Sequence, residues 1–214
     1  MTYVDIVNNV LRRIREEEVT SVQDNTYSKM VGDFVNDAKS LVEDAWDWSG
    51  LRTTSVIPTV DSTSVYAITG SQDKIKVLDV INDTANVFME YRPASWFRDK
   101  YYNKEVVSGT PLYYTFSGVD ASGDTQMQVY PQPDAVYSIR VTSVIRNDLL
   151  VNNTDELHVP HMPVIHMAVA LLARERGETG GTSTPEYFAI ADKYLSDAIA
   201  LDAAKHPEET VWYS

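Results

Sequence analysis

Three of the four histidines lie close together, in the stretch "HVPHMPVIH" from His158 to His166. Imidazole nitrogens at this spacing can ligate zinc. However, His158 and His161 flank a proline at the predicted start of a helix, and no cysteine, HExxH motif or helically spaced glutamate completes a ligand set. We therefore interpret the three histidines as polar residues satisfied at a helix start, and zinc binding is the alternative.

Other stretches that resemble catalytic or ligand-binding motifs are incomplete. "GETGGTS" lacks the lysine that contacts the β- and γ-phosphates in a phosphate-binding loop, and it follows a helical pattern instead of a strand. Asp120 and Asp124 in "DASGD" lack the spacing of an EF-hand and are typical of a hairpin turn. There is no GxSxG motif and no cysteine nucleophile. We predict no catalytic residues, no metal site and no cofactor.

The residue types that do suggest binding are concentrated between Tyr91 and Lys104, in "YRPASWFRDKYYNK". Basic residues alternate there with aromatic ones, a combination that can stack single-stranded bases, bind a glycan or anchor a protein interface. A protein partner is favoured because the rest of the chain is acidic. The alternative is that the rings belong to a core while the basic side chains extend to solvent. The candidate partner-binding residues are Trp96, Phe97, Arg98, Tyr101 and Tyr102.

The C-terminal stretch "ETVWYS" is the second candidate for partner binding. Val211, Trp212 and Tyr213 follow the last predicted helix, where chain ends are usually polar and frayed. Trp and Tyr are also enriched at binding hot spots. Two interpretations remain open: the tail docks on the chain's own surface, or it inserts into a neighbouring molecule.

Acidic residues outnumber basic residues by 31 to 18 in this chain of 214 residues, which gives a net charge of −13. DNA-binding surfaces are usually basic because their affinity comes from neutralising phosphates. Most of this surface should therefore repel DNA. The charge suits either simple solubility or a duct through which DNA passes without sticking.

The composition also restricts the compartment. The absence of cysteine rules out disulfides and fits a reducing cytoplasm. The N-terminal residues do not have the pattern of a signal peptide. No window approaches the roughly 20 apolar residues of a membrane span, so we expect no direct membrane binding.

Helical periodicity marks both ends of the chain. Apolar residues recur every three to four positions in residues 3–16 and, most strongly, in residues 27–48. Further along, "MPVIHMAVALLA" is apolar almost all round, which is typical of a helix buried among others. A last helix is predicted to begin after Ser183 or Thr184 and to end near Pro207.

The end of the second helix carries two tryptophans at the point where the pattern changes. Trp46 lies on the apolar face, whereas Trp48 should point about 200° away around a helix of 3.6 residues per turn. We expect Trp46 to close the helical core, Trp48 to lean outward over the following segment, and Gly50 to end the helix in the left-handed conformation. The alternative is that both rings pack in one core.

Between Leu51 and about Asn147 the apolar period is close to two, and β-branched and aromatic residues are abundant. Turn-forming clusters such as "TGSQD" and "SGVDASGD" separate the segments. Seven short strands are predicted, in "SVIPTV", "SVYAIT", "KIKVLDVI", "NVFMEYR", "PLYYTF", "TQMQVYP" and "YSIRVTSVIR".

These patterns predict an α+β fold with two parts. Residues 1–50 and 155–214 would form a four-helix bundle with a C-terminal tail, and residues 51–154 an inserted antiparallel β-sandwich or barrel. The bundle can form only if the two ends of the insertion lie close together. Trp46, Trp48 and Gly50 mark that junction.

The order of these elements resembles the head-to-tail adaptor (connector or gateway) proteins of tailed bacteriophages, the group that includes tail tubular protein A. Three stretches carry the resemblance: "LVEDAWDWSGLRTTSVIP", "GTPLYYTFSGVDASGDTQMQVYPQPDAVYSIRVTSVIRNDLL" and "DELHVPHMPVIHMAVALLARERGE". The likeness is one of order and spacing, since none of the three is a catalytic-type signature. It covers about three quarters of the chain.

The resemblance implies a structural, non-enzymatic virion protein at the head–tail junction, made in the host cytoplasm. Such proteins form a ring, commonly of twelve copies, beneath the portal protein, hold tail or nozzle proteins, and let double-stranded DNA cross the lumen during genome ejection. A C-terminal extension often reaches the portal, which would give the tail a role. A neck or tail completion protein with the same fold is the alternative within phage assembly.

Overall fold

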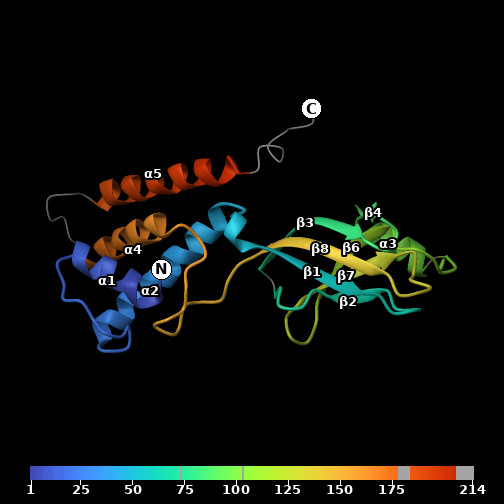
Figure 1. Cartoon of the computed structure of the whole chain (residues 1–214), viewed down its shortest axis with the longest axis horizontal. Coiled ribbons are helices and arrows are strands. Elements are labelled where there is room, and N and C mark those ends of the chain that lie inside the picture. The colour runs from blue at the N-terminus through green and yellow to red at the C-terminus, as the bar shows by residue number, and fades with distance from the viewer. Residues whose placement is uncertain (73, 103, 178–183, 206–214) are drawn as a thin grey trace. The chain divides into compact units, whose positions relative to one another are not determined.

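The computed structural model describes residues 1–72, 74–102, 104–177 and 184–205 (Figure 1). The described residues form a mixed α+β fold, as predicted from the sequence. Its α-helices are α1 (Tyr3–Arg13), α2 (Thr26–Ala45), α3 (Ala94–Tyr102), α4 (His161–Arg176) and α5 (Thr184–Ala203). Its strands are β1 (Arg52–Pro58), β2 (Val65–Ala67), β3 (Ile75–Asn82), β4 (Val87–Phe88), β5 (Glu90–Tyr91), β6 (Tyr113–Val119), β7 (Thr125–Tyr130) and β8 (Ser138–Ile145).

The chain divides into two compact units, which we call the helical unit and the β unit. The helical unit consists of Met1–Leu51 and Asn147–Ser214, and the β unit of Arg52–Arg146. The helical unit is therefore built from both ends of the chain.

Helix α4 is the centre of the helical unit. It packs against α1, α2 and α5. Figure 1 shows α4 (orange) between α5 on one side and α1 and α2 on the other. From Pro163 to Ala173 every side chain of α4 is buried except His166, which is half-buried. A helix with neighbours on several sides needs apolar residues around its circumference, which explains its nearly continuous apolar sequence.

The segment that leads back from the β unit is held to the N-terminal helices by backbone hydrogen bonds. The N–H of Tyr3 donates to the carbonyl of Asp155 at 2.8 Å, and the N–H of Leu157 donates to the carbonyl of Met1 at 3.1 Å. These bonds join parts of the chain that are about 150 residues apart in sequence. They join the two sequence segments of the helical unit.

Polar side chains of α2 make a second set of bonds to this returning segment. Asn36 accepts from the N–H of Leu150 at 2.9 Å and donates to its carbonyl at 3.0 Å. The Nζ of Lys39 donates to the carbonyl of Asn147 at 2.8 Å and lies 3.0 Å from a carboxylate oxygen of Glu43. The Lys39 and Glu43 side chains are only 1% and 2% exposed. The buried face of α2 thus contains a polar clamp, defined as Asn36, Lys39 and Glu43.

The clamp alters the predicted face of α2. The apolar period of residues 27–48 predicts that Leu41 and Trp46 lie on the buried face, but Leu41 is 49% exposed and Trp46 is half-buried. For Leu41 the reason is that the buried face is rotated toward the polar residues that bind the returning segment, whereas Trp46 lies beyond the end of α2. Periodicity of apolar residues could not reveal this.

The expected roles of the two tryptophans are also corrected. Helix α2 ends at Ala45, and Trp48, not Trp46, is the ring that is 1% exposed, with its Nε1 donating to the carbonyl of Val42 at 2.7 Å. Gly50 lies in the short 3-10 helix Ser49–Leu51 and not at a left-handed helix end. Glycine is needed there because a Cβ atom would collide with the carbonyl oxygen of His158.

The β unit is a sandwich of two four-stranded sheets. One sheet has the order β1-β8-β3-β4 and the other β2-β7-β6-β5. The pairings are antiparallel except that of β5 with β6, which is parallel. Side chains from both sheets form one apolar core: Tyr66, Ile68, Val80, Met89, Met127, Val129, Ile139 and Val141.

The predicted strand "NVFMEYR" is two short strands in different sheets. Val87–Phe88 forms the edge of the first sheet as β4, and Glu90–Tyr91 forms the edge of the second as β5. Met89 between them is only 6% exposed and packs in the shared core. The chain crosses between sheets at this residue because one buried side chain can serve both layers of a sandwich.

Candidate protein-interaction surfaces

Helix α3 carries the basic–aromatic residues selected from the sequence, and it packs on β6 of the β unit. Phe97 is 2% exposed. The Tyr101 hydroxyl donates to the carbonyl of Val129 at 2.6 Å. Burial raises the pKa of Tyr101 to about 12, so the hydroxyl stays protonated and remains a donor at neutral pH. Phe97 and Tyr101 therefore fasten the helix to the sheet.

Trp96 is half-buried in a cluster of rings. Its ring centroid is 5.1 Å from that of Tyr113 and 5.2 Å from that of Tyr130, two residues paired across β6 and β7. The Nζ of Lys100 lies 5.2 Å from the Trp96 centroid, and the Arg92 guanidinium lies 5.2 Å from that of Tyr113. Cations at this distance are attracted to the ring faces. Much of the basic–aromatic pattern is therefore satisfied within the β unit.

Arg98 and Tyr102 are the members of the predicted set that face solvent. Tyr102 is 82% exposed, the largest exposed fraction among the large apolar and aromatic side chains that the structure describes. Nearby, Lys104 and Asp99 form an ion pair of 2.7 Å. The outer side of α3 thus presents one aromatic ring among charged residues, a composition suited to the rim of a protein contact.

Phe88 was missed as a candidate by the sequence analysis. It is 70% exposed on the edge strand β4. Its position within an apolar run predicted a buried residue, and the exposure follows from the crossing at Met89, which leaves Phe88 at the edge of its sheet. No sequence signal we used distinguishes it from its buried neighbour.

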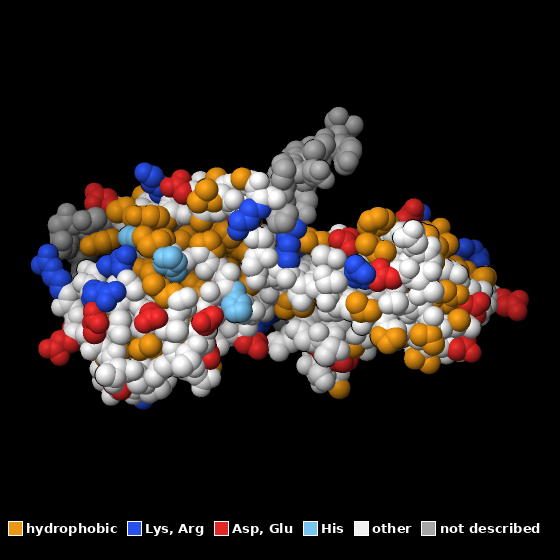
Figure 2. Space-filling view, viewed as in Figure 1, with side chains coloured by type: hydrophobic (Ala, Val, Ile, Leu, Met, Phe, Trp, Pro, Cys, Tyr) orange, Lys and Arg blue, Asp and Glu red, His pale blue; other side chains and the backbone are white. Residues whose placement is uncertain are grey.

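Helix α5 presents apolar residues on the helical unit. Ile190, Tyr194 and Leu201 are 42%, 37% and 74% exposed, and a period of 3.6 residues places them on one stripe. The Tyr194 ring stacks on His166 of α4, with centroids 4.3 Å apart. Figure 2 shows apolar side chains gathered over α4 and α5, with histidine side chains beside them. Only Ala191 and Asp202 of the described α5 residues are buried.

Asp202 fixes the C-terminal end of α5. Its carboxylate accepts from the backbone N–H of Ser49 at 2.9 Å and from the Ser49 hydroxyl at 2.5 Å. Lys205 donates to the same carboxylate at 2.9 Å. Burial by itself raises the pKa of Asp202, but the bonds from Ser49 and Lys205 outweigh it and leave the pKa below its usual value. The carboxylate is therefore ionised at neutral pH.

The histidine cluster does not form a metal site in the part of the chain that the structure describes. His158 and His161 are exposed, and no group of three or more His, Asp or Glu residues there is arranged to hold a metal ion. Burial, followed by the charge of Arg13, lowers the pKa of His166, so its ring is neutral at pH 7 while it stacks on Tyr194.

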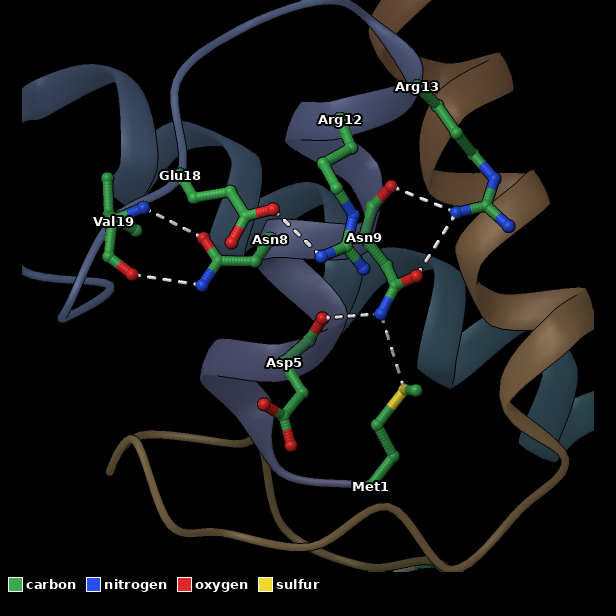
Figure 3. Close-up of polar contacts among 8 residues, drawn as sticks. All are labelled: Met1, Asp5, Asn8, Asn9, Arg12, Arg13, Glu18 and Val19. Atoms are coloured by element: carbon green, nitrogen blue, oxygen red, sulfur yellow. Dashed lines mark hydrogen bonds and ion pairs between the residues drawn. The ribbon is translucent and has the colours of Figure 1, made fainter.

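Helix α1 uses its polar residues for contacts within the helical unit (Figure 3). The Asn8 amide makes two bonds of 2.9 Å to the backbone of Val19 and so pins the connection between α1 and α2. Arg12 pairs with Glu18 at 2.8 Å, and Arg13 donates to the carbonyl of Asn9 at 3.0 Å. These arginines therefore serve the N-terminal fold rather than form a basic patch.

The net charge is concentrated in one unit. The helical unit contains 21 acidic and 9 basic residues, a net charge of −12, whereas the β unit contains 10 acidic and 9 basic residues, a net charge of −1. The acidity noted in the sequence is therefore almost entirely a property of the helical unit.

The second predicted partner-binding set, Val211, Trp212 and Tyr213, lies outside the described residues. No helix that the structure describes combines the length and apolarity needed to cross a bilayer.

The fold and these surfaces define an α+β protein whose exposed aromatic and apolar side chains are suited to contacts with other proteins. Residues 1–209 match the model of the family described as SU10 adaptor protein. The chain belongs to this family of phage adaptors. It is thus a structural protein of the virion, and its assignment to a phage adaptor family is confirmed. No curated protein matches the sequence.

Proposed function

We propose that this adaptor forms a ring at the head–tail junction, beneath the portal protein, in the manner of tail tubular protein A and related connectors. The ring joins the portal to tail or nozzle proteins, and double-stranded DNA passes through its lumen. The family match over residues 1–209 is the observation that carries this proposal, because it covers both units.

The charge distribution supports a role in DNA passage. A surface that held DNA phosphates would be basic, and its affinity would come from released counterions. The helical unit instead has a net charge of −12. Carboxylates lining a lumen would repel the duplex and let it slide. We therefore assign the lumen to the helical unit and the contacts with tail proteins to the β unit, whose α3 presents Arg98 and Tyr102.

The experiment is electron microscopy of the purified protein alone and mixed with the portal protein of the same virion. Mostly monomeric protein alone, and a ring seated on one end of the portal in the mixture, is the expected result. A ring that binds tail proteins but never the portal would support the neck or tail completion protein instead. A stable dimer at low concentration in sedimentation would contradict the proposal.

The C-terminal stretch of the chain provides a second test. A chain lacking residues 208–214 should fold normally, because it keeps every buried residue of the part that the structure describes, but should bind the portal more weakly because it lacks Trp212 and Tyr213. Co-sedimentation with portal, at several salt concentrations, measures the difference. Portal binding equal to that of the full chain would show that residues 208–214 do not contribute to the interface.

A further inference from the structure

The two sheets of the β unit differ in how their outer faces are covered. Tyr113 and Tyr130, on the outer face of the β2-β7-β6-β5 sheet, contact Trp96 of α3. On the outer face of the β1-β8-β3-β4 sheet, Val56 and Phe88 are instead 56% and 70% exposed. We call this second surface the bare sheet face.

The strand register shows which side chains share the bare sheet face. Val56 lies opposite Arg140, Arg140 opposite Ile81, and Ile81 opposite Phe88. Two rows further along, Arg52 lies opposite Val144 and Val144 opposite Lys76; Val144 is only 6% exposed, so the face is open mainly around Val56 and Phe88. Side chains alternate between faces along each strand, and the bulge between Val77 and Asp79 shifts the alternation in β3, so Lys76 and Ile81 lie on the same side and both rows share one face. The core residues Ile139 and Val141 occupy the other side of β8.

The bare sheet face combines exposed apolar groups with positive charge. Its basic side chains are Arg52, Lys76 and Arg140, and its acidic side chain is Asp79. Asp83, just beyond the end of β3, pairs with Arg140 at 3.0 Å. Val56 and Phe88 add exposed apolar area beside these charges.

The outward side of α2 has the complementary composition. Asp33, Asp37, Leu41 and Asp44 are all exposed, and a period of 3.6 residues places them within about a quarter of the helix circumference. Leu41 is 49% exposed among these carboxylates. We call this set the α2 stripe. It belongs to the unit that carries nearly all of the net negative charge.

We propose that the bare sheet face of one copy docks on the α2 stripe of a second copy. Arg52, Lys76 and Arg140 would face the three aspartates, and Val56 and Phe88 would meet Leu41. Charge complementarity commits the site to a second copy of this chain, since each copy carries both members of the pair.

A contact between two different surfaces of the same protein is heterologous, and its repetition generates a closed ring when the rotation closes. The inference therefore rests on the proposed ring and deepens it by naming the faces that meet. It also explains how subunits with such acidic helical units can associate: each helical unit meets the nearly neutral β unit of its neighbour rather than another acidic helical unit.

The chain has no cysteine, so introduced thiols report single contacts. The test variant is Leu41→Cys with Val56→Cys, treated with a short bismaleimide at high protein concentration, alone and on the portal. We expect a ladder of covalent oligomers. The matched control pairs Leu41→Cys with Val119→Cys, because Val119 is 56% exposed, as Val56 is, but lies at the end of β6 in the other sheet. It should give no ladder.

Mixing the two single variants, Leu41→Cys and Val56→Cys, should give only a crosslinked dimer of one of each. Homodimers of either single variant would indicate a two-fold contact and overturn the inference. Absence of the ladder at high concentration also overturns it, whether or not rings form. Rings on the portal without the ladder would leave the proposed function standing, and a ladder without portal binding would leave only the inference standing.

A charge exchange gives a second readout without crosslinking. Lys76→Glu and Asp37→Lys should each reduce self-association at least several-fold, measured by sedimentation at low salt, where charge pairs are least screened. The double variant restores one opposite-charge pair in every interface and should recover most of the loss. Equal association of the unchanged protein, the two single variants and the double variant would overturn the role of these charges.

Discussion

The helical unit and the β unit are stabilised in different ways. The β unit is one continuous stretch, and its two sheets share an apolar core to which β2, β3, β7 and β8 all contribute. The helical unit joins two segments from opposite ends of the chain, and the polar clamp of Asn36, Lys39 and Glu43 holds the returning segment. Hydrophobic burial is non-directional, whereas hydrogen bonds specify which backbone atoms meet. The comparison indicates that a discontinuous unit needs directional bonds where its segments join.

The units also differ in charge, at −12 for the helical unit and −1 for the β unit. Net charge governs association and solubility more than fold. The surface of the helical unit is therefore strongly acidic, whereas acidic and basic side chains nearly balance in the β unit.

The largest expected effect comes from breaking the polar clamp with Lys39→Met. The substitution leaves the Glu43 carboxylate buried without its cation, which should lower the free energy of unfolding of the helical unit by about 3–5 kcal/mol. Urea denaturation followed by hydrogen exchange would assign the loss to this unit. The double variant Lys39→Met with Glu43→Leu should recover much of it. No recovery would mean that the bond to the carbonyl of Asn147 matters more than the ion pair.

Met127→Ala is the corresponding change in the β unit. Met127 is fully buried in the apolar core. Truncation should therefore lower the free energy of unfolding of the β unit by about 2–5 kcal/mol, because apolar burial is lost and a cavity is left. Hydrogen exchange should show the loss in Arg52–Arg146, with α1, α2 and α4 still protected. Simultaneous loss of protection in both units would show that they unfold together, and would weaken the comparison.

Asp202→Asn tests how firmly α5 is attached within the helical unit. The substitution removes a charged acceptor of three hydrogen bonds and should destabilise the docking of α5 by about 1.5–3 kcal/mol. Exchange of α5 amides should accelerate while α4 stays protected. Leu201→Ala, an exposed neighbour, is the control that should leave exchange unchanged.

The same carboxylate predicts a pH dependence. The folded pKa of Asp202 is below its unfolded value, so its contribution is fully present above the unfolded pKa of about 4 and is lost as pH falls through the folded pKa. Acid should release α5 from Ser49 in the native chain, but the Asp202→Asn variant should lack this component.

Gly50→Ala should lower the free energy of unfolding of the helical unit by about 1–3 kcal/mol. The added methyl group meets the backbone carbonyl of His158, which cannot rotate away as a side chain could. Near-ultraviolet circular dichroism of the buried Trp48 and urea denaturation would detect it. A neutral result would mean that the returning segment shifts easily at this point.

Tyr102→Ala should have the smallest effect on folding, within about 0.5 kcal/mol, because the ring is 82% exposed. Its effect should instead appear in binding to tail proteins, if α3 forms that contact. Tyr101→Phe is the matched contrast: it removes the bond to Val129 and should reduce stability by about 1 kcal/mol with binding unchanged. Lost stability in Tyr102→Ala together with lost binding in Tyr101→Phe would mean that Tyr102 fastens the helix and Tyr101 binds the partner.

Periodicity in the sequence predicted the α+β class, the buried helix α4 and the positions of most strands, because these depend on the spacing of apolar residues within short windows. It did not predict that "NVFMEYR" divides between two sheets, since the crossing at Met89 depends on which layers lie nearby. Within the basic–aromatic set, the sequence did not separate the rings that fasten α3, such as Phe97, from exposed Tyr102.

The sequence by itself determined the classes of element, the absence of disulfide and cysteine chemistry, and the net charge of −13, because each depends only on residue type and local order. Only the tertiary structure decided that Trp48 is buried, that Gly50 lies against the backbone of His158, and that Lys39 is enclosed with Glu43. The contacts of Gly50 and Lys39 involve the returning segment, which lies more than 100 residues away in the chain. Local patterns do not contain information about a contact at that separation.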